Sequence, residues 1–161
     1  MSSKNTKIPE DMIERLARQI HADYLDKMRK AGSTGLPNAV EWDALPDEFK
    51  ESNRNAARSF EGKLNSIGCD IAPADTSRPA IESFDDATLL KLSKAEHDRW
   101  MGEKLANGWT YAPVRDNAQK HHPMLIPYDQ LPLDEQQKDT NVVNNIIPLL
   151  KSIGLRVYKT I

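Results

Sequence analysis

Aromatic and cationic side chains gather between residues 100 and 128, a combination that suits binding of a planar base carrying phosphate. The members are Trp100, Trp109, Tyr111, Arg115, Lys120, His122 and Tyr128. Trp100 falls in the middle of an expected helix, where a tryptophan more often belongs to the core. Trp109 follows Gly108 in an expected loop, where side chains more often serve function. We therefore expect a ligand-binding cluster in which Trp109 or Trp100 stacks on the base.

The four histidines and the single cysteine do not have the spacing of a metal or catalytic site. His21 and His97 each stand three residues before an aromatic residue, which places each pair on one helix face. We favour hydrogen-bonded core histidines, with a cleft-lining residue as the alternative. The adjacent His121 and His122 have no third ligand at suitable spacing, so we predict no metal site. Cys69 is expected to be a small buried hydrophobe.

Signatures of catalysis are missing from the sequence. It contains no nucleophile elbow, no glycine loop that cradles phosphate and no dinucleotide-binding fingerprint. Glu96 and His97 are adjacent, but neighbours on a helix point apart. The sequence therefore predicts no catalytic residue and no cofactor. A nucleotide-processing enzyme is the least favoured hypothesis, and it rests on His97 or His122 as a general base.

The scaffold that must position these residues is duplicated. Residues 37–46 recur as residues 123–132 at an offset of 86, and this register continues to the end of both copies. The helices that precede them match at an offset of 76, as in His21 and His97. Self-similarity of this kind indicates a repeated supersecondary unit. The second copy carries extra residues just after Gly108, and this decoration of one copy suggests where function lies.

Capping and periodicity predict two helices in each copy. The first helices are expected over residues 9–32 and 85–108, and the second helices over 46–68 and 132–154. Gly62 and Pro148 occupy equivalent positions and both weaken a helix interior, so we expect a kink or break in each second helix. Short strands are expected after the second helices and in residues 109–114. The predicted fold class is mainly α, with two pseudo-twofold-related helical hairpin repeats, kinked second helices and short β segments.

Composition places the chain among ordinary globular proteins. It has 161 residues, of which 39% are hydrophobic and 29% charged, with a net charge of -2. A field this weak does not attract DNA, RNA or an anionic membrane. No apolar run approaches the ~18 residues of a membrane span, and the polar N-terminus does not look like a signal peptide. We therefore expect a cytoplasmic protein with no nucleic-acid or membrane partner.

Ordered landmarks in the second copy resemble those of a known family. They are His97-x-x-Trp100, Gly108-Trp109-Thr110-Tyr111, the string Lys120-x-His122-Pro123-x-Leu125-x-Pro127-Tyr128-x-x-Leu131, and Lys138-Asp139. This pattern resembles the RyR domain, the repeat of the ryanodine receptor. The resemblance implies a prokaryotic or phage-type standalone protein with two RyR-like halves in one compact domain. Its expected parts are a disordered tail at 1–8, a divergent half at 9–72, a linker at 73–84 and the second repeat at 85–161.

The family resemblance also implies a cleft between the repeats that binds adenine nucleotides. In this chain the seven aromatic and cationic residues would line the cleft, and Asn53 and Arg54 of the divergent half could contribute. Two departures concern the identity of the ligand. Thr140 stands where the family often has arginine, and Ala112 stands where it usually has glycine.

Two hypotheses of different classes remain. The favoured one is a non-enzymatic module that senses or sequesters a nucleotide or a nucleotide-derived second messenger, in anti-phage defence or counter-defence. The alternative is a protein-interaction or assembly module without a small-molecule ligand, whose partner would be an effector protein or a second copy of the chain. An exposed apolar patch would favour this alternative.

Overall fold

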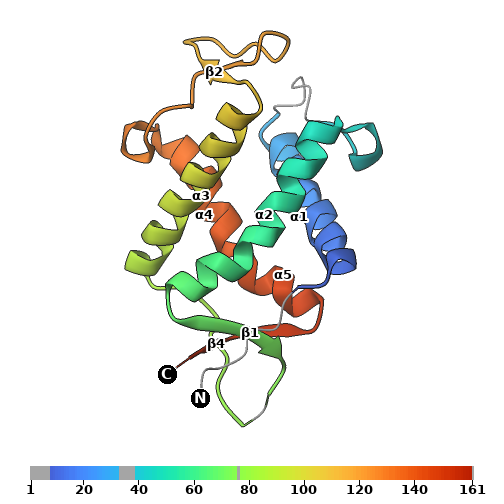
Figure 1. Cartoon of the computed structure of the whole chain (residues 1–161), viewed down its shortest axis with the longest axis vertical. Coiled ribbons are helices and arrows are strands. Elements are labelled where there is room, and N and C mark those ends of the chain that lie inside the picture. The colour runs from blue at the N-terminus through green and yellow to red at the C-terminus, as the bar shows by residue number, and fades with distance from the viewer. Residues whose placement is uncertain (1–7, 33–38, 76, 161) are drawn as a thin grey trace. The chain divides into compact units, whose positions relative to one another are not determined.

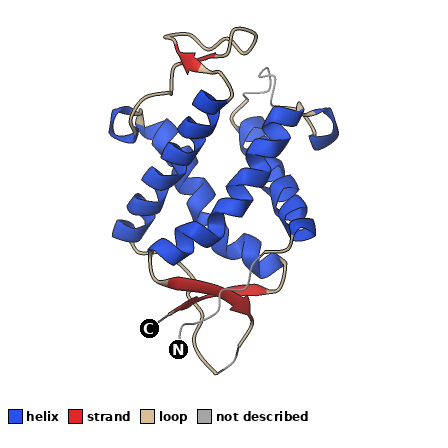
Figure 2. Cartoon of the chain, in the orientation of Figure 1, coloured by secondary structure: helices blue, strands red, loops and turns tan. Residues whose placement is uncertain are grey.

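Helices make up most of the structure, a computed structural model that describes residues 8–32, 39–75 and 77–160 (Figure 1). The mainly helical fold class with short β segments is confirmed (Figure 2). The predicted tail at residues 1–8 lies outside the described residues except for Ile8, which is buried. None of the helices within the described ranges has the length and apolar composition needed to cross a bilayer.

Contacts divide the chain into two compact units. Unit 1 combines Met1–Ser83 with Asn145–Ile161, and unit 2 is Phe84–Asn144. This grouping divides the predicted second repeat, because its last helix and strand belong to unit 1. The predicted arrangement of both halves in one compact domain stays a prediction.

Two long helices form the body of unit 1. α1 spans Glu10–Lys30 and α2 spans Asp47–Ser66, and they pack side by side (Figure 1). α1 begins after Pro9 with acidic residues in its first turn, where the helix dipole favours them. Its buried apolar positions follow helical spacing and are Ile13, Leu16, Ala17 and Leu25. A 3-10 turn, η1 at Trp42–Ala44, precedes α2 and adds Trp42 to an apolar cluster with Ala17.

A two-stranded antiparallel sheet completes unit 1 (Figure 2). β1 (Cys69–Pro73) follows α2, and β4 (Leu155–Lys159) follows the short helix α5 (Ile146–Ser152). Ile71 lies opposite Val157, its counterpart in the second copy, and both side chains are fully buried. The strand pair therefore has a local twofold relation, which arises when a duplicated strand pairs with its own copy.

Unit 2 is built around α3 (Asp86–Ala106) and α4 (Leu133–Asn144), which pack against each other (Figure 1). Asp85 caps α3 by accepting a hydrogen bond from the Thr88 N–H at 2.8 Å. The chain leaves α3 through Gly108, whose φ of 88° is left-handed and favours glycine. The short elements between the helices are β2 at Thr110–Tyr111, β3 at His121–His122 and η2 at Tyr128–Gln130.

The expected interruption of the second helices is present in one copy. α4 ends at Asn144, four residues before Pro148, and α5 begins at Ile146. Proline has no N–H to donate to the carbonyl four residues earlier, and its ring crowds that carbonyl, so the helix breaks there. In the first copy α2 runs without interruption through Gly62, so the short terminal helix predicted there is not formed. Glycine keeps its N–H and costs only ~1 kcal/mol in a helix interior.

Equivalent elements keep the offsets of the sequence repeat. α1 and α3 are both 21 residues long and begin at Glu10 and Asp86, an offset of 76. α2 and the α4–α5 pair begin at Asp47 and Leu133, an offset of 86, and the two strands keep the same offset. The secondary structure is therefore compatible with the duplication inferred from sequence.

Candidate functional site

Five aromatic rings contact one another in unit 2. The His97 ring stacks on Trp100 with centroids 5.6 Å apart, and Tyr128 meets His97 edge-on at 6.2 Å. The His122 ring lies edge-on to Trp100 at 4.9 Å and to Trp109 at 6.1 Å. We call these five residues the aromatic cluster. It brings together four of the residues predicted from sequence and adds His97.

Separate elements supply the members of the aromatic cluster. His97 and Trp100 stand one turn apart on α3, as their spacing predicts. His122 comes from β3 and Tyr128 from η2. Trp109 is anchored just beyond α3, where its N–H donates to the Lys104 carbonyl at 3.0 Å. The cluster is therefore a product of tertiary packing within unit 2.

Burial separates the cluster into framework and accessible faces. Trp109 is only 3% exposed, and Tyr128 is also buried, so both belong to the framework of unit 2. Trp100 and His122 are half-buried, and Tyr111 is 56% exposed. Tyr111 also lies opposite His122 in the parallel β2–β3 pair. The aromatic surface open to a ligand thus comes from Trp100, His122 and Tyr111, rather than from Trp109 as the loop position suggested.

Positive charge surrounds His122. Burial lowers the pKa of His122 to about 4, and the positive charges of Arg115 and Lys104 add to this effect. The Lys104 ammonium lies 5.0 Å from the centroid of the Trp109 ring. His122 Nδ1 accepts a hydrogen bond from the Met124 N–H at 3.1 Å, which a neutral imidazole can do. His122 is therefore a neutral ring held in a positive potential, an environment that favours a nearby anion.

Arg115 and Lys120, the predicted cations of the loop after α3, are both held by hydrogen bonds. Arg115 Nε donates to the side-chain oxygen of Asn117 at 2.8 Å. Lys120 Nζ donates to the Asn107 carbonyl at 2.6 Å. Lys120 also has a left-handed φ of 56°, and its carbonyl accepts the Thr110 N–H at 2.9 Å where β2 meets β3. Lys120 thus shapes the loop as well as contributing charge.

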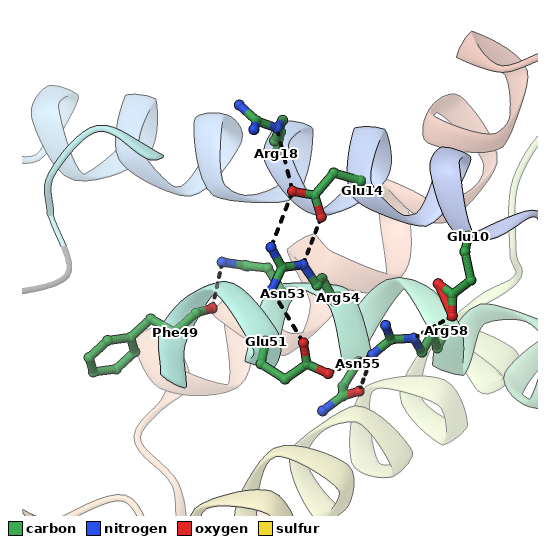
Figure 3. A network of polar contacts seen from close by, with 9 residues as sticks. All are labelled: Glu10, Glu14, Arg18, Phe49, Glu51, Asn53, Arg54, Asn55 and Arg58. Atoms are coloured by element: carbon green, nitrogen blue, oxygen red, sulfur yellow. Dashed lines mark hydrogen bonds and ion pairs between the residues drawn. The ribbon is translucent and has the colours of Figure 1, made fainter. Parts of the chain in front are cut away.

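Arg54, predicted as a phosphate-binding residue, is part of an ion-pair network in unit 1 (Figure 3). Its guanidinium binds both carboxylate oxygens of Glu14, at 2.7 and 3.2 Å, and also contacts Glu51 at 3.3 Å. The hydrogen bonds from Arg54 lower the pKa of Glu14. Because Glu14 belongs to α1 and Arg54 to α2, the pair ties the two helices together.

The other members of this network have structural partners as well. Asn53 donates to the Phe49 carbonyl at 3.0 Å (Figure 3). Arg58 contacts Glu51 at 2.8 Å and Glu10 at 3.3 Å. Asn53 and Arg54 therefore serve the packing of unit 1, and their predicted contribution to a shared cleft stays a prediction.

Each histidine that precedes an aromatic residue is a buried, hydrogen-bonded core residue, as favoured from the sequence. His21 Nε2 lies 2.5 Å from the Val40 carbonyl, and His97 Nε2 lies 2.7 Å from the Ile126 carbonyl. His21 also stacks on Tyr24, as His97 does on Trp100. The two copies repeat this geometry at equivalent positions. In the second copy, Trp109 and His122 of the loop after α3 add two further rings to this arrangement.

Sequence reasoning missed two functional candidates in unit 2. Lys104 is buried beside Trp109. Its position one turn after Trp100 on α3 could have identified it from the sequence. Asp139 lies 3.6 Å from His97 Nδ1. The first copy has Asn53 at the equivalent position, and this difference between the copies could have identified Asp139 from the sequence. Both side chains lie against the aromatic cluster, Lys104 beside Trp109 and Asp139 beside His97.

The single cysteine of the sequence is a packing residue. Cys69 is buried at the start of β1, and burial raises the pKa of its thiol, which makes it a small packing residue as expected. Within the described ranges, no group of three or more His, Cys, Asp or Glu residues is arranged to hold a metal ion.

A comparison with protein-family models finds one match that covers more than half of the chain. Residues 71–159 match the model of the RyR domain. The matched region contains α3, α4 and α5 together with the whole aromatic cluster.

Proposed function

This chain belongs to the RyR domain family, and on that premise we propose that it is a non-enzymatic module that binds a nucleotide or a nucleotide-derived messenger. The proposed binding surface is the accessible part of the aromatic cluster together with Tyr111 and Arg115. One observation carries the proposal: the half-buried rings of Trp100 and His122 lie edge-on at 4.9 Å, and the positive charges of Arg115 and Lys104 act on His122. Accessible aromatic rings next to positive charge suit a planar ligand that carries an anionic group.

The arrangement suits a ligand with one flat apolar part and one anionic part. Trp100 and Tyr111 offer aromatic faces, on which a base stacks with ~1–3 kcal/mol. Arg115 now donates to the amide oxygen of Asn117. The guanidinium forms a charge-assisted hydrogen bond with either acceptor, and a phosphate adds the attraction of its own negative charge and a second oxygen for a bidentate contact. Arg115 can therefore exchange the Asn117 oxygen for a phosphate oxygen.

The proposed role is to sense or sequester the messenger rather than to transform it. The family resemblance supports a setting in prokaryotic or phage proteins, in anti-phage defence or counter-defence, and in the cytoplasm. A module of this kind transmits binding to an effector protein or lowers the free concentration of the messenger.

Thermal unfolding against a panel of nucleotides tests the proposal. The panel contains ATP, ADP, AMP, NAD, ADP-ribose and cyclic dinucleotides. A ligand present at a hundredfold excess over its dissociation constant adds ~2.7 kcal/mol of stability. A folded protein that responds to none of these compounds would contradict nucleotide binding.

Two variants test the location of the site with little effect on folding. Tyr111→Ser removes an exposed aromatic face, and Arg115→Gln removes the cation that helps to lower the pKa of His122. Both should weaken binding about tenfold or more, which is the loss of ~1.4 kcal/mol. Lys94→Gln is the matched control, because Lys94 is a partly exposed cation of α3 that pairs with Asp129. Binding that survives both variants would place the site elsewhere.

Exposed apolar side chains favour protein interaction as the second candidate function. Leu105, Tyr111 and Val114 are 53%, 56% and 76% exposed and lie close together in sequence. Such side chains are common at interaction surfaces when they form one patch. Light scattering separates the candidates, because a second copy bound through this segment would double the mass and Val114→Asp would reverse it.

A further inference from the structure

A buried histidine–carboxylate pair lies directly behind the aromatic cluster. His97 is 2% exposed, and its Nε2 lies 2.7 Å from the Ile126 carbonyl. A carbonyl oxygen only accepts, so Nε2 carries a hydrogen. The other ring nitrogen, Nδ1, lies 3.6 Å from Asp139 Oδ2. If His97 were neutral and Asp139 ionised, the unprotonated Nδ1 and the carboxylate oxygen Oδ2 would face each other, and both are hydrogen-bond acceptors.

The surroundings of Asp139 favour retention of a proton. Its side chain is 15% exposed. Burial raises the pKa of Asp139 to about 7, with further contributions from the negative charges of Glu96 and Glu135. Positive groups oppose this effect only in part. They are Arg99 on α3 and Lys138 on α4.

Arg99, the positive group that lowers the pKa of Asp139 most, already binds two other carboxylates. Arg99 binds both carboxylate oxygens of Glu96, at 3.0 and 2.9 Å. It also binds Glu103 at 2.9 Å. Two carboxylates thus share one guanidinium, which leaves little positive charge to stabilise an ionised Asp139.

The fold does not require an acid at this position. In the first copy Asn53 stands where Asp139 stands in the second, and His21 makes the same carbonyl contact as His97. The Asn53 amide donates to the Phe49 carbonyl within its own helix. The acid therefore occurs only in the copy that also has the aromatic cluster, which points to a role in that cluster.

His97 couples the pair to the proposed ligand surface. Its ring stacks on Trp100, which in turn contacts His122 edge-on. Positive charge on His97 is among the causes that lower the pKa of His122. A change in the charge of this pair therefore changes the electrostatic potential at the surface on which an anion would bind.

We propose that the Asp139 carboxyl, which lies against Nδ1 of the buried His97, keeps a proton near neutral pH, and that loss of this proton weakens binding of an anionic ligand at the aromatic cluster. The proton departs to solvent, and the carboxyl changes from neutral to one negative charge. That charge repels the ligand. The ligand half of this inference rests on the proposed function, whereas the proton on Asp139 does not.

The proton on Asp139 is tested in the ligand-free protein by NMR. The Asp139 carboxyl carbon is followed across a pH titration, and no variant is needed. We expect this carboxyl to titrate near neutral pH. Titration of the Asp139 carboxyl near the usual ~3.9 of an aspartate would overturn the inference.

The regulation is tested with ADP-ribose, whose diphosphate keeps its charge between about pH 6 and about pH 8. One charge at ~10 Å changes affinity on the order of fivefold, so wild type should bind about fivefold more tightly at the lower pH. Asp139→Asn, which copies the first repeat, should remove this difference. Asp98→Asn, an exposed acid of α3, is the control and should keep it. Wild-type binding without pH dependence, or a dependence that persists in Asp139→Asn, would overturn the regulation.

The two experiments separate this inference from the proposed function. If ADP-ribose and the rest of the nucleotide panel fail to bind at either pH, the proposed function and the regulation are both wrong. The NMR titration still decides whether Asp139 keeps its proton near neutral pH. If ADP-ribose binds but Asp139 titrates in the usual range, only this inference is wrong.

Discussion

Replacement of Asp139 by asparagine should change how the stability of the protein depends on pH. The pKa of Asp139 is raised from 3.8 to about 7 by burial, helped by Glu96 and Glu135. Between these two values the folded state binds more protons than the unfolded state, so wild-type stability falls as pH rises through this window. Below the window both states are protonated, and above it both are ionised, so the contribution is constant there.

The size of the effect follows from the same two pKa values. Each unit corresponds to about 1.4 kcal/mol, so the whole window is worth about 4 kcal/mol. Between about pH 5 and pH 8 the loss is about 2–3 kcal/mol, since part of the window lies below pH 5. Asp139→Asn has no proton to lose and should lack this component.

Urea unfolding of wild type and variant at both pH values measures the difference directly. The quantity of interest is the change in unfolding free energy with pH in wild type minus that in Asp139→Asn. Asp98→Asn is the matched control and should keep the wild-type slope, because Asp98 is an exposed acid on the neighbouring helix α3. Parallel pH profiles for wild type and Asp139→Asn would refute the reasoning, because they would show that burial does not hold a proton on this carboxyl.

Three further predictions concern other parts of the molecule. Trp109→Ala should cost ~3–5 kcal/mol in urea unfolding, because the side chain is 3% exposed, and a near-neutral change would contradict its framework role. Gly62→Ala should stabilise by ~0.5–1 kcal/mol, because its Cβ meets nothing within 4 Å inside α2; the same change at Gly68, with a φ of 72°, should destabilise by ~1 kcal/mol. NMR should show the pKa of His122 rising from about 4 when a nucleotide binds, since an anion offsets the charge of Arg115. An unchanged His122 pKa in the bound protein would place the anion away from this ring.

The two copies differ at the positions that form an ion pair in the first copy and lie beside the aromatic cluster in the second. In the first copy Arg54 and Glu14 join α1 to α2, and the position of Asp139 is filled by Asn53. In the second copy Thr140 replaces the arginine and accepts or donates a hydrogen bond with Ser93 at 3.3 Å. The second copy thus has no counterpart of the Arg54–Glu14 pair, and Asp139 lies against His97 of the aromatic cluster.

Local structure was readable from the sequence because it depends on short-range rules. Three patterns predicted the positions of the main helices. They are proline and acidic residues at the first turn, glycines at the last turn, and a sequence repeat with two offsets. Pro148 interrupts its helix as expected, because a missing N–H is a property of the residue itself. The short terminal helix predicted after Gly62 is not formed, because a glycine only lowers helix propensity and tertiary packing readily outweighs that cost.

The sequence predicted only some of the residues that form the candidate site. The sequence alone indicated a family, a helical fold and a group of aromatic and cationic residues in the second copy. Tertiary structure decided that Trp109 is buried while Trp100 and His122 are half-exposed, and that Asp139 meets His97 across two helices. Burial and the pairing of charges depend on residues distant in sequence, which approach one another only when α3 and α4 pack.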